Sequence, residues 1–141
     1  MKRIILSFIL VVGALAGRAQ SDGNEVLGRW VNEQKTSKIE FVQEGDLYVG
    51  KLVWMAEAND ASGKPKTDRN NPDAGKRNQP LVGSTLISGL TYANGKWTGG
   101  KLYLPKRGIY ANCSLSIVNG QLHISASKGM FSETKIWSRE P

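Results

Sequence analysis

The stretch Tyr110–Ala126, YANCSLSIVNGQLHISA, holds two runs of alternating apolar and polar residues, separated by Asn119-Gly120. Such alternation is typical of β-strands with one buried face. Asn-Gly between two such runs indicates the tight turn of a β-hairpin. One face of the predicted hairpin is apolar (Ala111, Cys113, Leu115, Ile117, Leu122, Ile124, Ala126), and the other is polar (Asn112, Ser114, Ser116, His123, Ser125).

The same two-residue period recurs along most of the remaining chain, and no segment has a sustained helical period. A second turn, Asn94-Gly95, precedes another β-rich run, and several of the 16 glycines fall inside strand runs, which suits strong coiling. We therefore expect an all-β fold, an antiparallel up-and-down β-barrel of about eight strands, because closure removes exposed strand edges. The other runs that carry the pattern are Ile39–Phe41, Leu47–Met55, Lys96–Leu104 and Thr134–Trp137.

The N-terminus has the pattern of a secretory signal peptide. Lys2 and Arg3 precede the apolar run Ile4–Leu15, and small residues stand at Gly17 and Ala19. The run is shorter than the roughly 20 residues that cross a bilayer. The pattern predicts a cleaved signal at residues 1–19 and a single domain at 20–141. No cysteine follows the cleavage site to accept a lipid, so we expect a periplasmic or secreted protein without an integral membrane segment.

The charge pattern argues against nucleic acid as a partner. The chain carries +7, but three of its 19 basic residues lie in the predicted signal, which leaves 16 against 12 acidic residues, or +4. These residues are scattered, whereas nucleic-acid binding needs a concentrated basic face.

Two motifs at the ends of the predicted domain are Gly28-Arg-Trp30 and Trp137-Ser-Arg139. An arginine over an indole gains packing and cation–π attraction. Together with the segments listed below, these motifs resemble the DUF2147 family over nearly the whole predicted domain. The further segments are Asp68–Asp73, Arg77, Pro80–Gly83, Gly89-Leu90, Trp97–Tyr103, Pro105, Tyr110 and Cys113.

The resemblance implies a small exported bacterial protein of unknown function with a lipocalin-like, or calycin-like, barrel. It implies structural roles for Gly28, for Trp30 as a plug of the closed end, and for Arg139 across the indole. The chain departs from the family at Leu104-Pro105, where Asp-Pro is usual, so any shared site that needs this carboxylate is in doubt. The resemblance implies no activity.

Residues 57–80 form one long connection, which is usually either functional or a self-packed cover. Within it, Asp68, Asn70 and Asp73 offer oxygen atoms at close spacing, but position twelve counted from Asp68 is Gln79, so the EF-hand pattern fails and we expect no metal. Two alternatives remain. The residues form a turn at Asn71-Pro72-Asp73, pinned by Arg69 or Arg77 pairing with Asp68 or Asp73, or they form the polar rim of a ligand pocket.

The chain has one cysteine and one histidine, Cys113 and His123, which the alternation places on opposite faces of the hairpin. This excludes a structural zinc site and a Ser–His–Asp triad. We therefore expect no cofactor and assign no catalytic residue.

The function that this pattern favours is non-catalytic binding of a small, partly apolar ligand at the open end of the barrel. The tentative contacts are Trp54, Trp97 and Tyr110, with Asp68, Asn70, Asp73 and Arg77 at the rim. The alternation places Tyr103 outside the barrel. One alternative is a cell-envelope module that binds a protein or glycan through its outer surface and the 57–80 loop, which a solidly packed interior would favour. A third is an uncharacterised enzyme that uses carboxylates among Glu57, Asp60, Asp68, Asp73 and Glu133.

Overall fold

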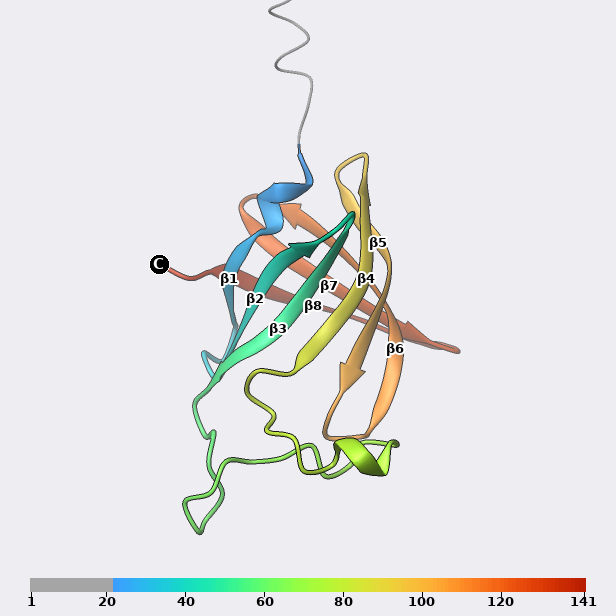
Figure 1. The fold of residues 1–141 in the computed structure, drawn as a ribbon. Helices are drawn as coiled ribbons and strands as arrows, with labels where there is room; N and C mark the ends of the chain where they lie inside the picture. Colours follow the sequence, from blue (N-terminus) through green and yellow to red (C-terminus); the bar gives the residue numbers. More distant parts are fainter. Residues whose placement is uncertain (1–21) are drawn as a thin grey trace, which may run out of the picture.

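The computed structural model describes residues 22–141, so the predicted signal peptide lies outside the described residues. The chain forms a closed barrel in which eight antiparallel strands follow one another in chain order (Figure 1). This confirms the predicted fold class. The strands are β1 (Gly28–Asn32), β2 (Ser37–Glu44), β3 (Leu47–Met55), β4 (Thr85–Ala93), β5 (Lys96–Leu104), β6 (Ile109–Val118), β7 (Gln121–Lys128) and β8 (Phe131–Arg139), with short 3-10 helices η1 (Gly23–Val26) and η2 (Ala74–Lys76).

The two predicted Asn-Gly turns join neighbouring strands of the barrel. Asn94-Gly95 links β4 to β5 with φ of 53° and 82°, and Asn119-Gly120 links β6 to β7 with φ of 53° and 79°. Positive φ at both central residues matches the right-handed twist of the flanking strands. The hairpin register, Val118 opposite Gln121, follows from this turn.

The barrel closes where β1 meets β8, with Trp30 opposite Arg139. Trp30 is fully buried, and its indole Nε1 donates to the carbonyl of Val26 at 2.9 Å. The Arg139 guanidinium lies 4.0 Å from the centre of the Trp30 ring and donates to the carbonyls of Leu27 and Glu25, each at 2.7 Å. The arginine therefore ties the last strand to the segment that enters the first.

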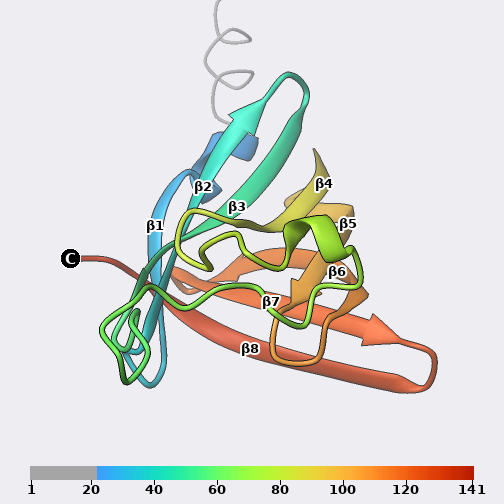
Figure 2. The same cartoon turned by 60° about the horizontal axis from the view of Figure 1, so that its bottom comes forward.

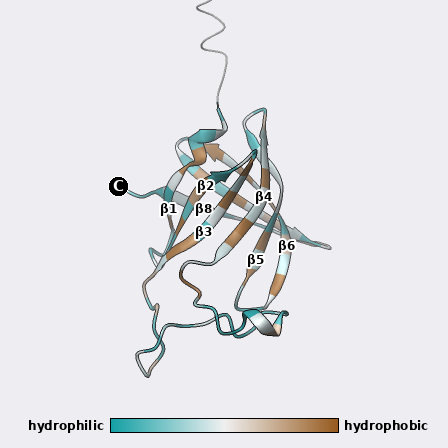
Figure 3. Ribbon diagram, viewed as in Figure 1, coloured by the Kyte–Doolittle hydropathy of each residue, from teal (hydrophilic) through white to brown (hydrophobic). Residues whose placement is uncertain are grey.

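The hydrophobic core fills the end of the barrel near η1. Along the strands, hydrophobic and hydrophilic residues alternate, whereas the connection around η2 is mostly hydrophilic (Figure 3). The largest fully buried side chains are Trp30, Trp97, Phe41, Ile87, Leu90, Leu122 and Val26. Within residues 22–141, no helix has the length and hydropathy required to span a membrane.

Candidate functional site

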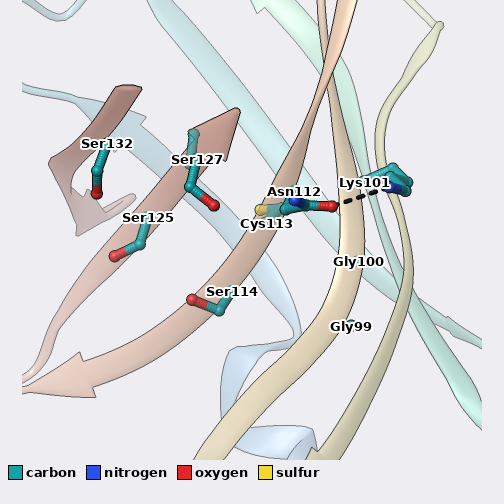
Figure 4. Close-up of a pocket in the computed structure, with 10 residues that line it drawn as sticks. Gly99, Gly100, Lys101, Asn112, Cys113, Ser114, Ser125, Ser127 and Ser132 are labelled. Carbon is teal, nitrogen blue, oxygen red and sulfur yellow. Dashed lines mark hydrogen bonds between the residues drawn. The ribbon is translucent and has the colours of Figure 1, made fainter. Parts of the chain in front are cut away.

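A groove of about 460 Å³ lies against β5, β6, β7 and β8 (Figure 4). Most of its side chains carry a hydroxyl, amide or amine group. We call it the serine groove; its lining consists of Gly99, Gly100, Lys101, Asn112, Cys113, Ser114, Ser125, Ala126, Ser127 and Ser132.

Strand register places the polar side chains of the serine groove on the outer face of the barrel. Ser114 lies opposite Ser125, and Ser125 lies opposite Thr134. Successive side chains of a strand point to opposite faces. The neighbours of Ser114 in the chain, Cys113 and Leu115, belong to the buried core, so Ser114 and its cross-strand partners face outward.

A β-bulge shapes the floor of the groove. Between the pairs Trp97–Leu115 and Gly100–Cys113, β5 contains one residue more than β6. Gly99 takes φ of 78°, and an added Cβ there would meet no atom within 4 Å. A Cβ on Gly100 would instead overlap Leu90 in the core. The bulge bends β5, as bulges do, and the two glycines leave the floor without side chains.

The groove offers hydrogen-bonding groups that other side chains leave unused. Lys101 Nζ donates to Asn112 Oδ1 at 2.8 Å, and the Ser125 and Thr134 hydroxyls lie 2.9 Å apart. Among residues 22–141, the hydroxyls of the three other serines have no hydrogen-bond partner: Ser114, Ser127 and Ser132. These groups are free to bind a polar ligand.

An aromatic side chain borders the same face. Tyr110 precedes Asn112 by two residues on β6, so both point outward. Tyr110 is 45% exposed, and its ring centre lies 4.9 Å from that of Tyr103. Tyr110 thus presents an exposed aromatic ring on the same outer face of β6, two residues along the strand from the groove residue Asn112.

Within residues 22–141, the groove has neither an exposed thiol nor a cluster of metal-ligating residues. The only thiol of the chain, Cys113, is buried, and burial raises its pKa to about 12. Within the described part of the chain, no three His, Cys, Asp or Glu residues gather as metal ligands would. The arrangement is suited to hydrogen bonding and stacking.

The predicted rim residue Asp68 belongs to the long loop, and its side chain is buried. Its Oδ1 accepts a hydrogen bond from the Tyr103 hydroxyl at 2.7 Å, and its Oδ2 accepts one from Asn71 Nδ2 at 2.7 Å. Tyr103 faces away from the neighbouring core residue Leu102, as predicted, but the loop leaves it only 5% exposed. Burial, followed by the bond to Asp68, raises the pKa of Tyr103 to about 12.

The other predicted rim residues also hold the loop in place. Asn70 Nδ2 donates to the carbonyls of Pro105 and Lys106 at 3.3 and 3.1 Å, which pins the loop to the β5–β6 turn (Figure 2). Asp73 caps η2 by accepting from Gly75 N–H at 3.0 Å.

The predicted arginine–aspartate pair does not form within residues 22–141. Arg77 Nε donates to the carbonyl of Asn71 at 2.7 Å, and Arg77 Nη2 reaches the carbonyl of Pro72 at 3.5 Å. Asp68 is satisfied by Tyr103 and Asn71 instead, so the arginine is free to bond the backbone of the turn.

The three predicted aromatic contacts lie far apart and do not line one cavity. Trp97 is 1% exposed, and its Nε1 donates to the carbonyl of Gly23 beside η1. Tyr110 lies near the opposite end of the β5–β6 pair. Trp54 is 40% exposed, with Lys38 Nζ 5.2 Å from its ring centre. A β-bulge between Lys38 and its neighbour Ile39 sets Trp54 opposite Lys38 on the outer face.

The sequence interpretation missed the serine groove as a site, although its signals were present. The alternation in Tyr110–Ala126 placed Ser114 and Ser125 on one polar face. Gly99-Gly100 inside a strand run indicated a bulge. Only the register across four strands brings these features together.

Comparison with known proteins places the chain in a family. The family model described as "Uncharacterized protein conserved in bacteria (DUF2147)" matches residues 28–139. This chain is a member of the DUF2147 family. The matched residues span the barrel from β1 to β8.

A solved structure shares the fold of this DUF2147 protein. HP1028 from Helicobacter pylori, described as belonging to the lipocalin family, superposes with a TM-score of 0.71 and 21% sequence identity. The match covers 82% of this chain and 83% of that chain, and at this identity it shows the fold alone. A comparison with curated proteins gave no match.

Proposed function

We propose that this protein is a non-catalytic binding protein whose ligand is a small saccharide held in the serine groove. The observation that supports this is a hollow of about 460 Å³ on the outer barrel face, with three unpaired serine hydroxyls. Ligand sites commonly measure about 300–1,000 Å³.

The chemistry of the groove fits a sugar better than an apolar molecule. A sugar ring presents hydroxyl groups at its edge and C–H groups on its faces. Serine hydroxyls and the Asn112 amide both donate and accept hydrogen bonds, so they can bind the hydroxyl groups at the edge of a sugar ring. The exposed ring of Tyr110 offers an apolar face with a polar tip, which suits the C–H groups on the face of a sugar ring.

The packing of the barrel interior supports a site on the outside. Near η1 the interior is filled by core side chains, among them Trp30, Trp97 and Phe41. The partly apolar ligand and the aromatic contacts that the sequence predicts at the open end of the barrel have less support than the outer glycan site. Of those contacts, Tyr110 remains in the proposal.

The proposal includes export, so that the groove would meet saccharides of the cell envelope. The support is the pattern of Lys2, Arg3 and the apolar run Ile4–Leu15. Mass spectrometry of protein recovered from the producing cells tests this part. We expect a chain that begins at Gln20 in the periplasmic or extracellular fraction; an unprocessed chain in the cytoplasm would contradict it.

Saccharide binding is tested by titrating the purified protein with bacterial cell-wall oligosaccharides in a calorimeter. The double variant Ser114→Ala/Ser127→Ala should bind the best ligand roughly tenfold more weakly, because two hydrogen bonds of about 0.5–1.5 kcal/mol are lost. Ser116→Ala is the matched control, since Ser116 shares the outer face of β6 but does not line the groove.

Two outcomes would overturn the proposal. One is the absence of binding by any oligosaccharide tested. The other is a loss of affinity in Ser116→Ala as large as that in the double variant, because the groove would then not be the site.

A further inference from the structure

Part of one edge of β8 has no strand beside it within residues 22–141. β7 pairs with β8 from Phe131 to Trp137, but β1 pairs only with the last three residues, Trp137 to Arg139. Among residues 22–141, no backbone group outside β7 bonds to the segment Phe131–Ile136. Figure 2 shows the β7–β8 hairpin projecting away from β1 and β2. Six residues of strand expose an edge of about 20 Å.

Apolar side chains are exposed along this edge and at the hairpin tip. Met130 is fully exposed, Phe131 is 44% exposed and Ile136 is 40% exposed. Exposed apolar groups beside an unpaired strand edge are what an added strand covers. The edge therefore has the features of a docking surface.

Two charges stand at the centre of the same edge. Glu133 and Lys135 lie opposite Ala126 and Ile124 of β7, so both point toward the barrel side of β8. Their ion pair measures 2.9 Å, with the side chains 41% and 66% exposed. Charges on an edge strand usually oppose pairing, but these two have opposite signs and lie symmetrically about Thr134.

We propose that this edge binds the same edge of a second copy of the chain, antiparallel, with the two-fold axis at Thr134. Residues directly opposite in antiparallel strands share a face. This register sets Glu133 against the partner subunit's Lys135, and Lys135 against the partner subunit's Glu133. An axis at Glu133 or at Lys135 would instead set identical charges against each other, which is destabilising.

A second copy fits this edge because the charge pattern is complementary to itself. A two-fold interface requires each patch to match its own copy, and the opposite charges of Glu133 and Lys135 do so about Thr134. The unpaired backbone N–H and C=O groups of each copy can bond to those of the other copy. The proposal is independent of saccharide binding.

Sedimentation equilibrium of charge-reversed variants tests the proposal. The unaltered protein should dimerise, and Glu133→Lys and Lys135→Glu should each weaken the dimer roughly tenfold when alone, since like charges then face each other. An equimolar mixture of the two variants should dimerise again, because every facing pair is then opposite in charge. The double variant Glu133→Lys/Lys135→Glu should also regain the dimer.

Two controls separate the charge pattern from other effects. Lys64→Glu changes an exposed loop residue and alters net charge as Lys135→Glu does, so it should leave the dimer intact. Circular dichroism should show that every variant keeps its strands. A monomer at every concentration of the unaltered protein overturns the proposal, as does a mixture of the two single variants that stays monomeric.

Discussion

At the residue scale, Trp30 holds the end of the barrel near η1 together. Its ring is fully buried, lies under the Arg139 guanidinium and bonds the carbonyl of Val26. Replacing it with alanine would remove a large buried side chain and leave a cavity. We expect Trp30→Ala to lower the free energy of unfolding by about 3–5 kcal/mol in urea titrations.

Trp54 is the matched control for that measurement, because it is the same residue type on the outer surface. It is 40% exposed and contacts the Lys38 ammonium. Trp54→Ala should cost less than about 1 kcal/mol. Equal losses in the two variants would contradict the assignment of Trp30 as the plug.

The bond between Tyr103 and Asp68 predicts a pH dependence of stability. The pKa of Tyr103 is raised from 10.0 to about 12 by burial and by its bond to Asp68. The folded chain holds this proton more tightly than the unfolded chain, so this stabilisation is complete below the unfolded pKa and is lost as the pH rises through the folded one.

Tyr103→Phe isolates this contribution. At neutral pH the variant should lose about 1–3 kcal/mol, since the buried carboxylate keeps only Asn71 as its side-chain donor. The difference between the two proteins should shrink between about pH 10 and pH 12 in chemical unfolding curves. A difference that stays constant over that range would contradict the raised pKa.

At the element scale, the loop between β3 and β4 is tightly docked onto the β5–β6 turn. Gly108 of that turn takes φ of 64°, and a Cβ there would overlap the carbonyl oxygen of Asn70. Gly108→Ala should therefore displace the loop and expose Tyr103. We expect limited proteolysis to cut the 57–80 segment several times faster than in the unaltered protein.

Gly63 provides the control for backbone strain. It takes φ of 84°, but an added Cβ would meet nothing within 4 Å. Gly63→Ala thus adds strain at positive φ without displacing the loop contact, and its cleavage rate should stay near that of the unaltered protein. Similar cleavage of both variants would mean that the contact with Asn70 does not hold the loop.

The sequence predicts a structural element well when residues close together in the chain determine it, and poorly when distant segments do. Alternation and the Asn119-Gly120 turn were sufficient for the β6–β7 hairpin and its faces, because side-chain period and turn type are local. The face of Trp54 was not predictable, since one extra residue in a bulge changes it. Tyr103 was placed on the outer face correctly, yet its burial depends on a distant loop.

At the scale of the whole molecule, the packed core and the candidate binding groove lie on opposite faces of the sheet. The barrel is closed and its core packs around Trp30, whereas the serine groove lies outside, across β5 to β8. The likeness to a lipocalin-family protein is one of fold alone, and one fold can host many functions. The groove was not predicted because its residues come from four strands, and no pattern in one strand specifies it.

The most direct test of the account is NMR titration of the isotopically labelled protein with a cell-wall oligosaccharide. We expect the largest amide shifts at Gly99, Asn112, Ser114, Ser125 and Ser127, with Leu90 and Trp30 in the core almost unchanged. Shifts concentrated on the core-facing residues, or no shifts at saturating saccharide, would contradict a binding site on the outer face.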